Sequence, residues 1–328
     1  MAQKDNDDVI YILCPGGMAT GGPELLHQLC YKLNLLGYEV YMYYYSNPEN
    51  PVHERYKKYG NKYVTKIINT ESSIIIMPEI LARYTFSMEA KKIIIWWLSV
   101  DNFCKSLSST SVKEDDVFNI IRKRDQNKRL LHFAQSHYAI DYLKQNGIRD
   151  NEIYYLSDYI NDEFVKASSD GRNEQYRYPN IFYNPIKGYE FTSKIIKASP
   201  ELNWIPLRNY TPEEMRILMN RSRVYIDFGD HPGKDRIPRE AVLCGLCILT
   251  GRRGAAANEV DIPISDEYKI LDRDENIQQI INKIKEMIEN YEIEVKAFED
   301  YKNIIIQEEY KFEKDIRMIF ESNLFHCL

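Results

Sequence analysis

The sequence predicts an α/β protein with two Rossmann-like domains, each built on a doubly wound parallel sheet. Short apolar segments alternate with segments of helical periodicity along most of the chain, and the alternation starts again near residue 180. A strand that is followed by a helix and then by another strand lies parallel to that strand in one sheet. The 328 residues, 44% of them hydrophobic, are enough for two cores. We expect domains at 1–170 and 171–310, followed by a C-terminal helix at 311–328.

The first half opens with a buried strand and an amphipathic helix. The strand, "DVIYILCPGG" (8–17), is apolar and ends in glycines, and the helix at 23–37 has leucines three and four residues apart. Pro23 suits its first turn and Gly37 its end. Further strands are expected at 38–45, 72–79, 91–99, 128–136 and 151–159, with a helix at 137–147 that Ser136 caps. The polar segment 166–179 is the expected linker.

The second half repeats the pattern. Strands are expected at 180–184, 203–209, 223–229 and 246–251. Helices are expected after the loop at 185–188, at 211–222, at 238–245 and over much of 275–325. In the helix at 211–222, Thr211 is the expected N-cap and Pro212 takes the first helical position. Ligands of such sheets bind at the carboxyl ends of the strands, so we expect a ligand cleft there, between the two domains.

Composition excludes several classes of function. The net charge of −6 argues against a general nucleic-acid-binding surface. No apolar run approaches the roughly 18–20 residues of a membrane span, and the printed sequence starts with the polar "MAQKDNDD". We therefore expect a cytoplasmic protein with at most peripheral membrane contact. Cys244 and Cys247 form a C-x-x-C between a helix and a strand, and we interpret them as small buried residues.

A cluster of cations stands out in the otherwise acidic chain. The segment 225–256 is rich in glycine and proline, and six basic residues surround its predicted strand end and helix start: His231, Lys234, Arg236, Arg239, Arg252 and Arg253. Arginine and lysine at a helix start favour an anion such as a phosphate. The alternative is a solvated basic loop whose cations pair with Asp227, Asp230 or Asp235.

A glycine-rich loop precedes the first helix. It contains Gly16, Gly17, Gly21 and Gly22 in "PGGMATGGPELL". Glycines let backbone N–H groups approach a ligand, and the following helix start favours an anion. The spacing fits neither the dinucleotide pattern G-x-G-x-x-G nor a Walker A loop. A flexible turn without a ligand is the alternative.

These segments resemble the GT-B-fold glycosyltransferases, and more narrowly the large group of retaining enzymes that use sugar nucleotides. Residues 15–40 resemble the first loop and helix of that family, which implies that Gly21 and Gly22 lie near the donor phosphates. Residues 180–250 resemble its donor-binding half, which implies that Lys187 contacts the donor diphosphate and Glu240 the ribose. The family's first glutamate has no counterpart, because Pro232 stands in its place.

A further candidate residue lies just after the strand at 91–99, which ends at the expected edge of the ligand cleft. Asp101 follows this strand and is our candidate general base toward an acceptor hydroxyl, with a helix cap or Asx turn as the alternative. Trp96 and Trp97 precede it, and we expect one to face the core while the other is free to stack on sugar. The chain has no Asp-x-Asp of the kind expected in the metal-dependent alternative fold, and no His/Asp/Glu cluster with metal-ligand spacing. We therefore expect neither a metal nor a resident cofactor.

The resemblance implies transfer of a sugar from a nucleotide-sugar donor to a hydroxyl of a surface-glycan or lipid-linked acceptor. Lys187 and Arg236 would stabilise the leaving group, alongside His231, Lys234 and Arg239. It also implies that the last helix crosses back to the N-terminal domain. Three alternatives remain open: a transferase of CMP-activated acidic sugars, indicated by His231-Pro232; a UDP-sugar epimerase; and a non-catalytic nucleotide-sugar-binding partner.

Overall fold

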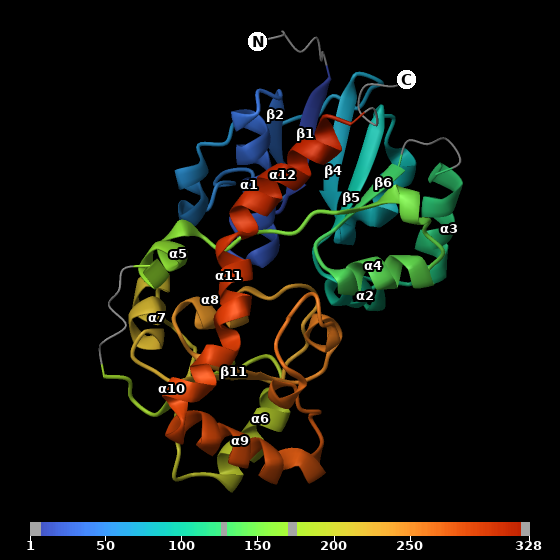
Figure 1. Ribbon diagram of the computed structural model, residues 1–328. Coiled ribbons are helices and arrows are strands. Elements are labelled where there is room, and N and C mark those ends of the chain that lie inside the picture. The colour runs from blue at the N-terminus through green and yellow to red at the C-terminus, as the bar shows by residue number, and fades with distance from the viewer. Residues whose placement is uncertain (1–7, 126–129, 170–175, 323–328) are drawn as a thin grey trace. The chain divides into compact units, whose positions relative to one another are not determined.

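The computed structural model describes residues 8–125, 130–169 and 176–322 (Figure 1). The chain divides into two compact units, Met1–Asp158 with Phe312–Leu328, and Tyr159–Lys311. Each unit contains one parallel β-sheet, so the predicted class of two Rossmann-like α/β domains is confirmed. The division falls between Asp158 and Tyr159, earlier in the chain than the polar segment expected as the linker. Part of that segment, 170–175, lies outside the described residues.

The first unit is built on a seven-stranded sheet of order β3-β2-β1-β4-β5-β6-β7. All neighbouring strands in it pair in parallel. The strands are β1 (Val9–Cys14), β2 (Val40–Tyr44), β3 (Tyr63–Val64), β4 (Ser73–Pro78), β5 (Lys92–Trp97), β6 (Leu130–Ala134) and β7 (Ile153–Tyr155). Every residue of β4 and β5 is buried, because strands in the middle of a parallel sheet are covered on both faces.

The α-helices described in this unit are α1 (Gly21–Leu35), α2 (Val100–Ser108), α3 (Glu114–Asp125), α4 (His137–Gln145) and, from Phe312 onward, α12 (Glu308–Phe320). Its described 3₁₀ segments are η1 (Glu54–Tyr59), η2 (Glu79–Ser87) and η3 (Asp150–Glu152). The predicted cap of α4 is confirmed, since the Ser136 hydroxyl accepts a hydrogen bond from the Ala139 amide.

The two tryptophans of β5 are both fully buried. Trp97 stacks on Phe118 of α3, and Trp96 stacks on Phe312 of α12. Alternation along the strand does send the two rings to opposite faces, as expected, but helices cover both faces. The expectation that one tryptophan is free to stack on sugar is therefore wrong.

The second unit is built on a four-stranded parallel sheet of order β11-β10-β8-β9. The strands are β8 (Asn180–Tyr183), β9 (Asn203–Pro206), β10 (Val224–Asp227) and β11 (Cys247–Thr250). The helices are α5 (Asp162–Ser169), α6 (Tyr189–Ala198), α7 (Pro212–Met219), α8 (Arg236–Leu243), α9 (Ile277–Glu289), α10 (Tyr291–Glu294) and α11 (Glu299–Ile306). Thr211 caps α7 and Pro212 opens it, as predicted.

Cys244 and Cys247 are buried in the core of this unit. Burial raises the pKa of both thiols to about 12, so both are protonated at neutral pH. Their interpretation as small buried residues is confirmed.

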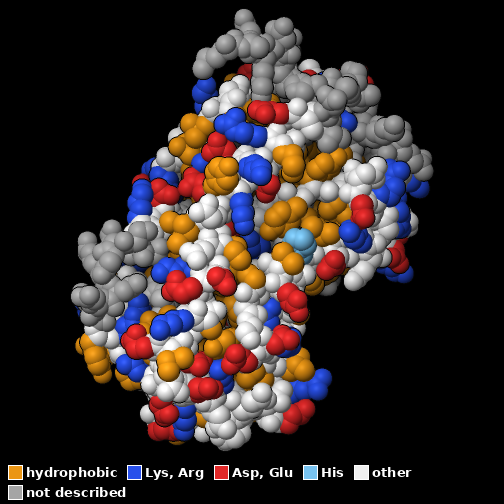
Figure 2. All heavy atoms as spheres, in the orientation of Figure 1, with side chains coloured by type: hydrophobic (Ala, Val, Ile, Leu, Met, Phe, Trp, Pro, Cys, Tyr) orange, Lys and Arg blue, Asp and Glu red, His pale blue; other side chains and the backbone are white. Residues whose placement is uncertain are grey.

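The distribution of surface charge and the polarity of the helices agree with the composition of the sequence. Figure 2 shows basic and acidic side chains mixed across the face in view. Within the described part of the chain, no helix combines the length and apolar character that crossing a bilayer requires.

Candidate functional site

Three loops of the second unit meet at the carboxyl ends of β8, β10 and β11. Glycines permit the contact: a Cβ on Gly188 would lie 2.3 Å from the Phe228 carbonyl oxygen, and a Cβ on Gly254 would lie 2.1 Å from the His231 carbonyl oxygen. Both glycines also have positive φ, 64° and 56°. Because the opposing atoms are backbone, both positions require glycine. The loops therefore pack into one surface at the edge of the sheet.

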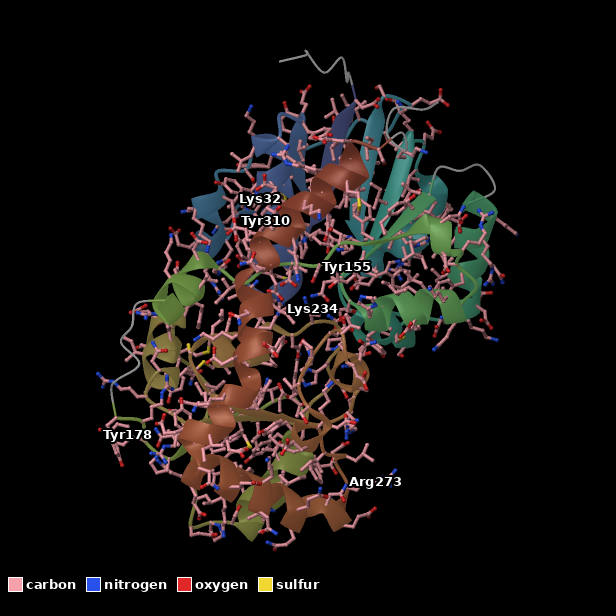
Figure 3. The ribbon with its side chains drawn as sticks, in the orientation of Figure 1. Lys32, Tyr155, Tyr178, Lys234, Arg273 and Tyr310 are labelled. Atoms are coloured by element: carbon pink, nitrogen blue, oxygen red, sulfur yellow. The ribbon has the colours of Figure 1, made fainter. Side chains whose placement is uncertain are left out.

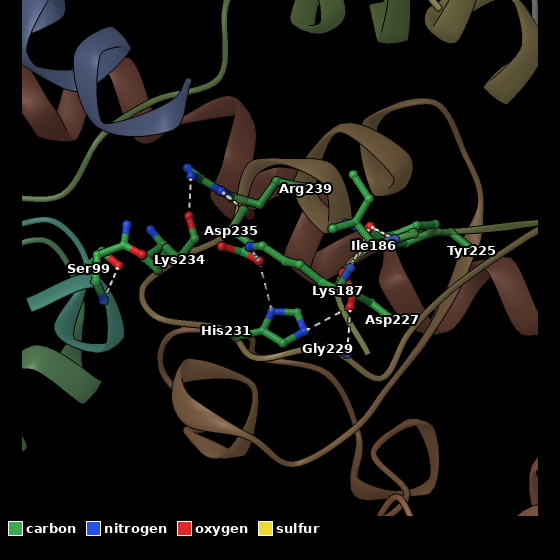
Figure 4. Close-up of polar contacts among 12 residues, drawn as sticks. Ser99, Ile186, Lys187, Tyr225, Asp227, Gly229, His231, Lys234, Asp235 and Arg239 are labelled. Atoms are coloured by element: carbon green, nitrogen blue, oxygen red, sulfur yellow. Dashed lines mark hydrogen bonds and ion pairs between the residues drawn. The ribbon is translucent and has the colours of Figure 1, made fainter. Parts of the chain in front are cut away.

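Lys187 lies on the first of these loops, after β8. The Asn184 side-chain oxygen accepts a hydrogen bond from its amide at 3.0 Å, and its Nζ lies 2.8 Å from Asp235 Oδ2 (Figure 4). Burial by itself lowers the pKa of Lys187, but the Asp235 carboxylate, with Asp227 and Asp230 nearby, raises it above its ordinary value. The side chain is 42% exposed. The loop thus presents a charged ammonium group to solvent at neutral pH.

Asp235 links Lys187 to the start of helix α8. Asp235 is the residue before the helix, and Arg236 is its first residue. Arg236 Nε lies 3.6 Å from Glu240 Oε1, one turn further along the helix, and Arg236 Nη1 donates a hydrogen bond to the Tyr159 carbonyl oxygen. The structure therefore brings Lys187, Arg236 and Glu240 together at the end of β10, and a helix N-terminus there favours an anion. We call these three residues the strand-end cluster.

His231 is completely buried beneath this cluster. Its Nε2 lies 3.6 Å from Asp227 Oδ1 and its Nδ1 lies 3.7 Å from Asp235 Oδ2 (Figure 4). Neither ring nitrogen makes a hydrogen bond to a described residue. The predicted contact between His231 and a donor phosphate does not fit this placement, because the ring has no surface that a ligand can reach.

In the described part of the chain, the group that most resembles a metal site is Asp227, His231 and Asp235. Single ligand atoms of Asp227, His231 and Asp235 lie within 4.8 Å of one another, although their spacing in the sequence gives no such signal. The two carboxylates face opposite nitrogens of one ring, and Asp235 already pairs with Lys187. Asp227 also accepts hydrogen bonds from the Tyr225 hydroxyl and the Gly229 amide. This arrangement does not favour one ion bound by all three.

Lys234 and Arg239 point to an internal carboxylate rather than to the edge of the sheet. Lys234, in the loop between β10 and α8 (Figure 3), has its Nζ 3.0 Å from Glu308 Oε1. Arg239 is fully buried, and its Nη1 lies 2.8 Å from Glu308 Oε2. Its other guanidinium nitrogens donate to the carbonyl oxygens of Lys234 and Asp235. The predicted phosphate contacts of Lys234 and Arg239 are therefore corrected: both cations neutralise Glu308 inside the unit.

The remaining cations of the basic segment are also paired. Arg252 lies 2.7 Å from Asp266, and Arg253 pairs with Asp272. Both arginines therefore take part in ion pairs at the surface, and of the three aspartates expected as partners these two arginines use only Asp230, through Arg253, among the described residues.

The glycine-rich loop of the first unit ends in helix α1. Gly21 and Gly22 are its first residues, and neither amide donates a hydrogen bond to a described residue. No atom would lie within 4 Å of a Cβ on Gly21. Two unpaired N–H groups at the start of a 15-residue helix are suited to an anion. The predicted phosphate contacts of Gly21 and Gly22 stay a prediction.

Asp101 lies in the first turn of α2, after β5. The helix is capped by Ser99, whose hydroxyl accepts a hydrogen bond from the Asn102 amide at 3.2 Å, so Asp101 is not the cap. Its Oδ1 instead accepts a hydrogen bond from the Tyr138 hydroxyl. The half-buried carboxylate is thus held in place at a strand end. Its role as a general base stays a prediction.

Glu79 is a buried carboxyl group that the sequence did not single out. It follows β4 directly and is 3% exposed. Burial raises its pKa from about 4.5 to about 7, although its Oε2 accepts a hydrogen bond from the Leu98 amide. A lone glutamate after an apolar strand carries no sequence signal for burial, because such residues usually face solvent.

Replacing Glu79 by glutamine is expected to remove a pH dependence of stability. The folded state binds this proton more tightly than the unfolded chain, so the stabilisation is complete below about pH 4.5 and is lost as the pH rises through about 7. Relative to Glu79→Gln, the wild type should lose about 3 kcal/mol of unfolding free energy across that window. Urea denaturation at several pH values measures this. The exposed Glu89→Gln is the control, and equal pH profiles for all three proteins would contradict the assignment.

Comparison with known proteins gives matches among solved structures only. No protein-family model and no curated protein sequence matches the chain. HepE of Anabaena, solved in complex with UDP, is similar with a TM-score of 0.65 and 12% identity, over 95% of this chain and 99% of HepE. A glycosyltransferase from Rickettsia africae has a TM-score of 0.62 and 11% identity, over 96% and 97% of the two chains.

A third similar structure is the apo form of the lipopolysaccharide outer core galactosyltransferase WaaB. Its TM-score is 0.59 at 10% identity, over 94% of this chain and 99% of that chain. Together these likenesses show that the chain has the GT-B fold. At 10–12% identity they show the architecture alone, because one fold hosts many chemistries.

Proposed function

We propose that the protein is a glycosyltransferase that moves a sugar from a nucleotide-sugar donor to a hydroxyl of an acceptor. The observation that carries this proposal is the strand-end cluster of Lys187, Arg236 and Glu240, at the start of helix α8. A cation pair beside a carboxylate suits a nucleoside diphosphate, which presents phosphates and ribose hydroxyls together. HepE, which shares the fold, has also been solved in complex with UDP-glucose.

In the proposed reaction the bond between the sugar and the β-phosphate breaks, and negative charge develops on the departing nucleotide. The Lys187 ammonium group is held by Asp235 and the Arg236 guanidinium by the Tyr159 carbonyl oxygen before the ligand arrives, so their positive charge is already in place when the leaving group becomes negative. The N-terminus of α8 adds favourable potential. Glu240 accepts hydrogen bonds from the ribose, and we propose Asp101 as the general base that takes the proton of the acceptor hydroxyl.

We further propose that these cations replace a metal ion at the diphosphate. Lys187 and Arg236 supply the positive charge that a divalent ion would otherwise supply. Donor turnover is then unaffected by EDTA. An activity that EDTA abolishes and that Mg²⁺ or Mn²⁺ restores would contradict this part of the proposal.

The proposal extends to the acceptor of the sugar and to the cell compartment in which the transfer takes place. WaaB, a transferase of the lipopolysaccharide outer core, has the same fold over nearly its whole length. We accordingly propose a surface-glycan or lipid-linked acceptor and assembly in the cytoplasm. The burial of His231 removes the residue on which a CMP-activated donor depended, which favours UDP or GDP.

Arg236→Ala and Glu240→Ala are each expected to weaken nucleotide binding. Loss of one charge-assisted hydrogen bond costs about 1.5–3 kcal/mol, or roughly 10- to 100-fold in Kd. Calorimetry of the full chain with UDP, GDP and CMP measures this. Arg273→Ala, an exposed arginine of the same unit that pairs with Glu275, is the control and should bind like the wild type. Absence of binding to all three nucleotides by the wild type would overturn the proposed function.

A further inference from the structure

The first unit contains a pocket of about 440 Å³ that the donor chemistry leaves unused. Such a volume is typical of sites for small molecules, which span roughly 300–1,000 Å³. Helix α1, the end of β2, the loop that follows it, η1 and β3 form its walls. Its aromatic lining is His27, Tyr44, Tyr56 and Tyr63.

The aromatic walls are held in place by hydrogen bonds. His27 Nδ1 lies 2.7 Å from the Pro23 carbonyl oxygen and therefore donates to it, while His27 Nε2 accepts from the Tyr44 hydroxyl at 2.9 Å. Burial lowers the pKa of His27, which agrees with this neutral form. The His27 ring stacks on Tyr56 at 4.3 Å between centroids. A ligand would meet surfaces that are already ordered, which lowers the entropic cost of binding.

The pocket is physically joined to the glycine-rich loop. The Tyr56 hydroxyl donates to the Thr20 carbonyl oxygen at 2.9 Å, and the Gly17 amide donates to the Pro51 carbonyl oxygen at 2.8 Å. Gly17 has a φ of 71°, a backbone conformation that residues with a Cβ rarely adopt, so the turn at this position favours glycine. The pocket wall and the loop before α1 thus form one body.

The polar groups at the pocket favour a neutral polyol over a nucleotide. Lys57 is the one cation among the described residues of the lining, and its Nζ lies 2.6 Å from a carboxylate oxygen of Glu54. Glu49 and Asn50 supply oxygen and amide groups at the rim, and Tyr63 leaves half of its surface exposed. Aromatic faces pack on the C–H face of a pyranose, while carboxylate and amide groups bind its hydroxyls.

We infer that this pocket binds a sugar unit of the glycan acceptor. The inference rests on the proposed function and specifies its acceptor: a glycan whose mono- or disaccharide portion packs on Tyr63 and hydrogen-bonds to Glu49 and Asn50. A ligand in this pocket lies against the wall that holds the glycine-rich loop. The pocket therefore selects the acceptor, whereas the strand-end cluster of the other unit binds the donor.

Saturation-transfer NMR on the full-length protein tests this inference. The probes are methyl glycosides of glucose, galactose and N-acetylglucosamine, with lactose and cellobiose as disaccharides. At least one probe should receive saturation from the wild type, and Tyr63→Ala and Glu49→Gln should each weaken its Kd by tenfold or more. The matched control is Tyr84→Ala, a tyrosine of the same unit that is 41% exposed and lies outside the pocket lining.

The outcomes separate this inference from the proposed function. Calorimetry with UDP on the same preparations reports on the donor site and should give equal Kd values for all these variants. UDP binding with no signal from any of the five sugars, or an equal loss in Tyr84→Ala, overturns the pocket and leaves the proposed function standing. A Tyr63-dependent sugar signal without binding of any nucleotide overturns the proposed function and supports the pocket.

Discussion

Replacing Glu308 by glutamine is expected to destabilise the second unit by about 3–5 kcal/mol, because it leaves two buried cations without a counter-charge. Glu308 is 4% exposed and pairs through one carboxylate oxygen with Lys234 and through the other with Arg239. Hydrogen exchange of the strands in this unit measures the loss, and β10 and β11 should exchange roughly two to four orders of magnitude faster.

Glu299→Gln is the control for that substitution. Glu299 is exposed on the preceding helix, α11, and its replacement should change exchange by less than about 0.5 kcal/mol. Equal exchange in Glu308→Gln and the wild type would show that the buried cations are neutralised in another way. Lys234 and Arg239 would then not have the neutralisation of Glu308 as their role.

Replacing Lys187 by alanine is expected to lower the rate of donor turnover by about 100- to 1,000-fold, the typical effect of removing one group that stabilises developing charge. Lys187 is charged, half-exposed and fixed at the end of β8, where its ammonium group can contact a phosphate. Release of UDP from a UDP-sugar, with and without an acceptor, measures kcat and KM. The fall should appear mainly in kcat.

Lys194→Ala is the matched control. Lys194 lies on α6 in the same unit and pairs with Asp274 at 2.7 Å on the surface, so its removal should leave turnover within about twofold of the wild type. Equal kcat values for the wild type and Lys187→Ala, with both proteins folded, would remove Lys187 from the reaction. A Lys187→Arg variant that recovers only part of the rate would fit a site shaped for a compact ammonium group.

Most strands could be predicted because they are apolar runs of parallel-sheet type. The segments expected at 72–79 and 91–99 became β4 and β5, whose every residue is buried. Helices α2 and α3 were not predicted, because residues 100–125 mix charged and apolar residues without a long clean period. β3 has only two residues, which is too short for any periodic signal.

Part of the candidate site followed from chain order and topology. Lys187 and Arg236 each come shortly after a strand, and neighbouring parallel strands bring such loops to one edge of the sheet. The role of Glu308 could not be predicted, because it lies 69 residues from Arg239 and resembles any other charge on an amphipathic helix. A basic cluster in a sequence therefore does not reveal which of its cations face solvent and which neutralise a distant carboxylate.

The most direct test of the central claim is a crystal structure of the full-length protein with UDP bound. The account predicts the diphosphate within about 3 Å of Lys187 Nζ and of the Arg236 guanidinium, with the ribose hydroxyls on Glu240. UDP bound at any other place, with Lys187 still paired to Asp235 and no phosphate at the start of α8, would contradict it.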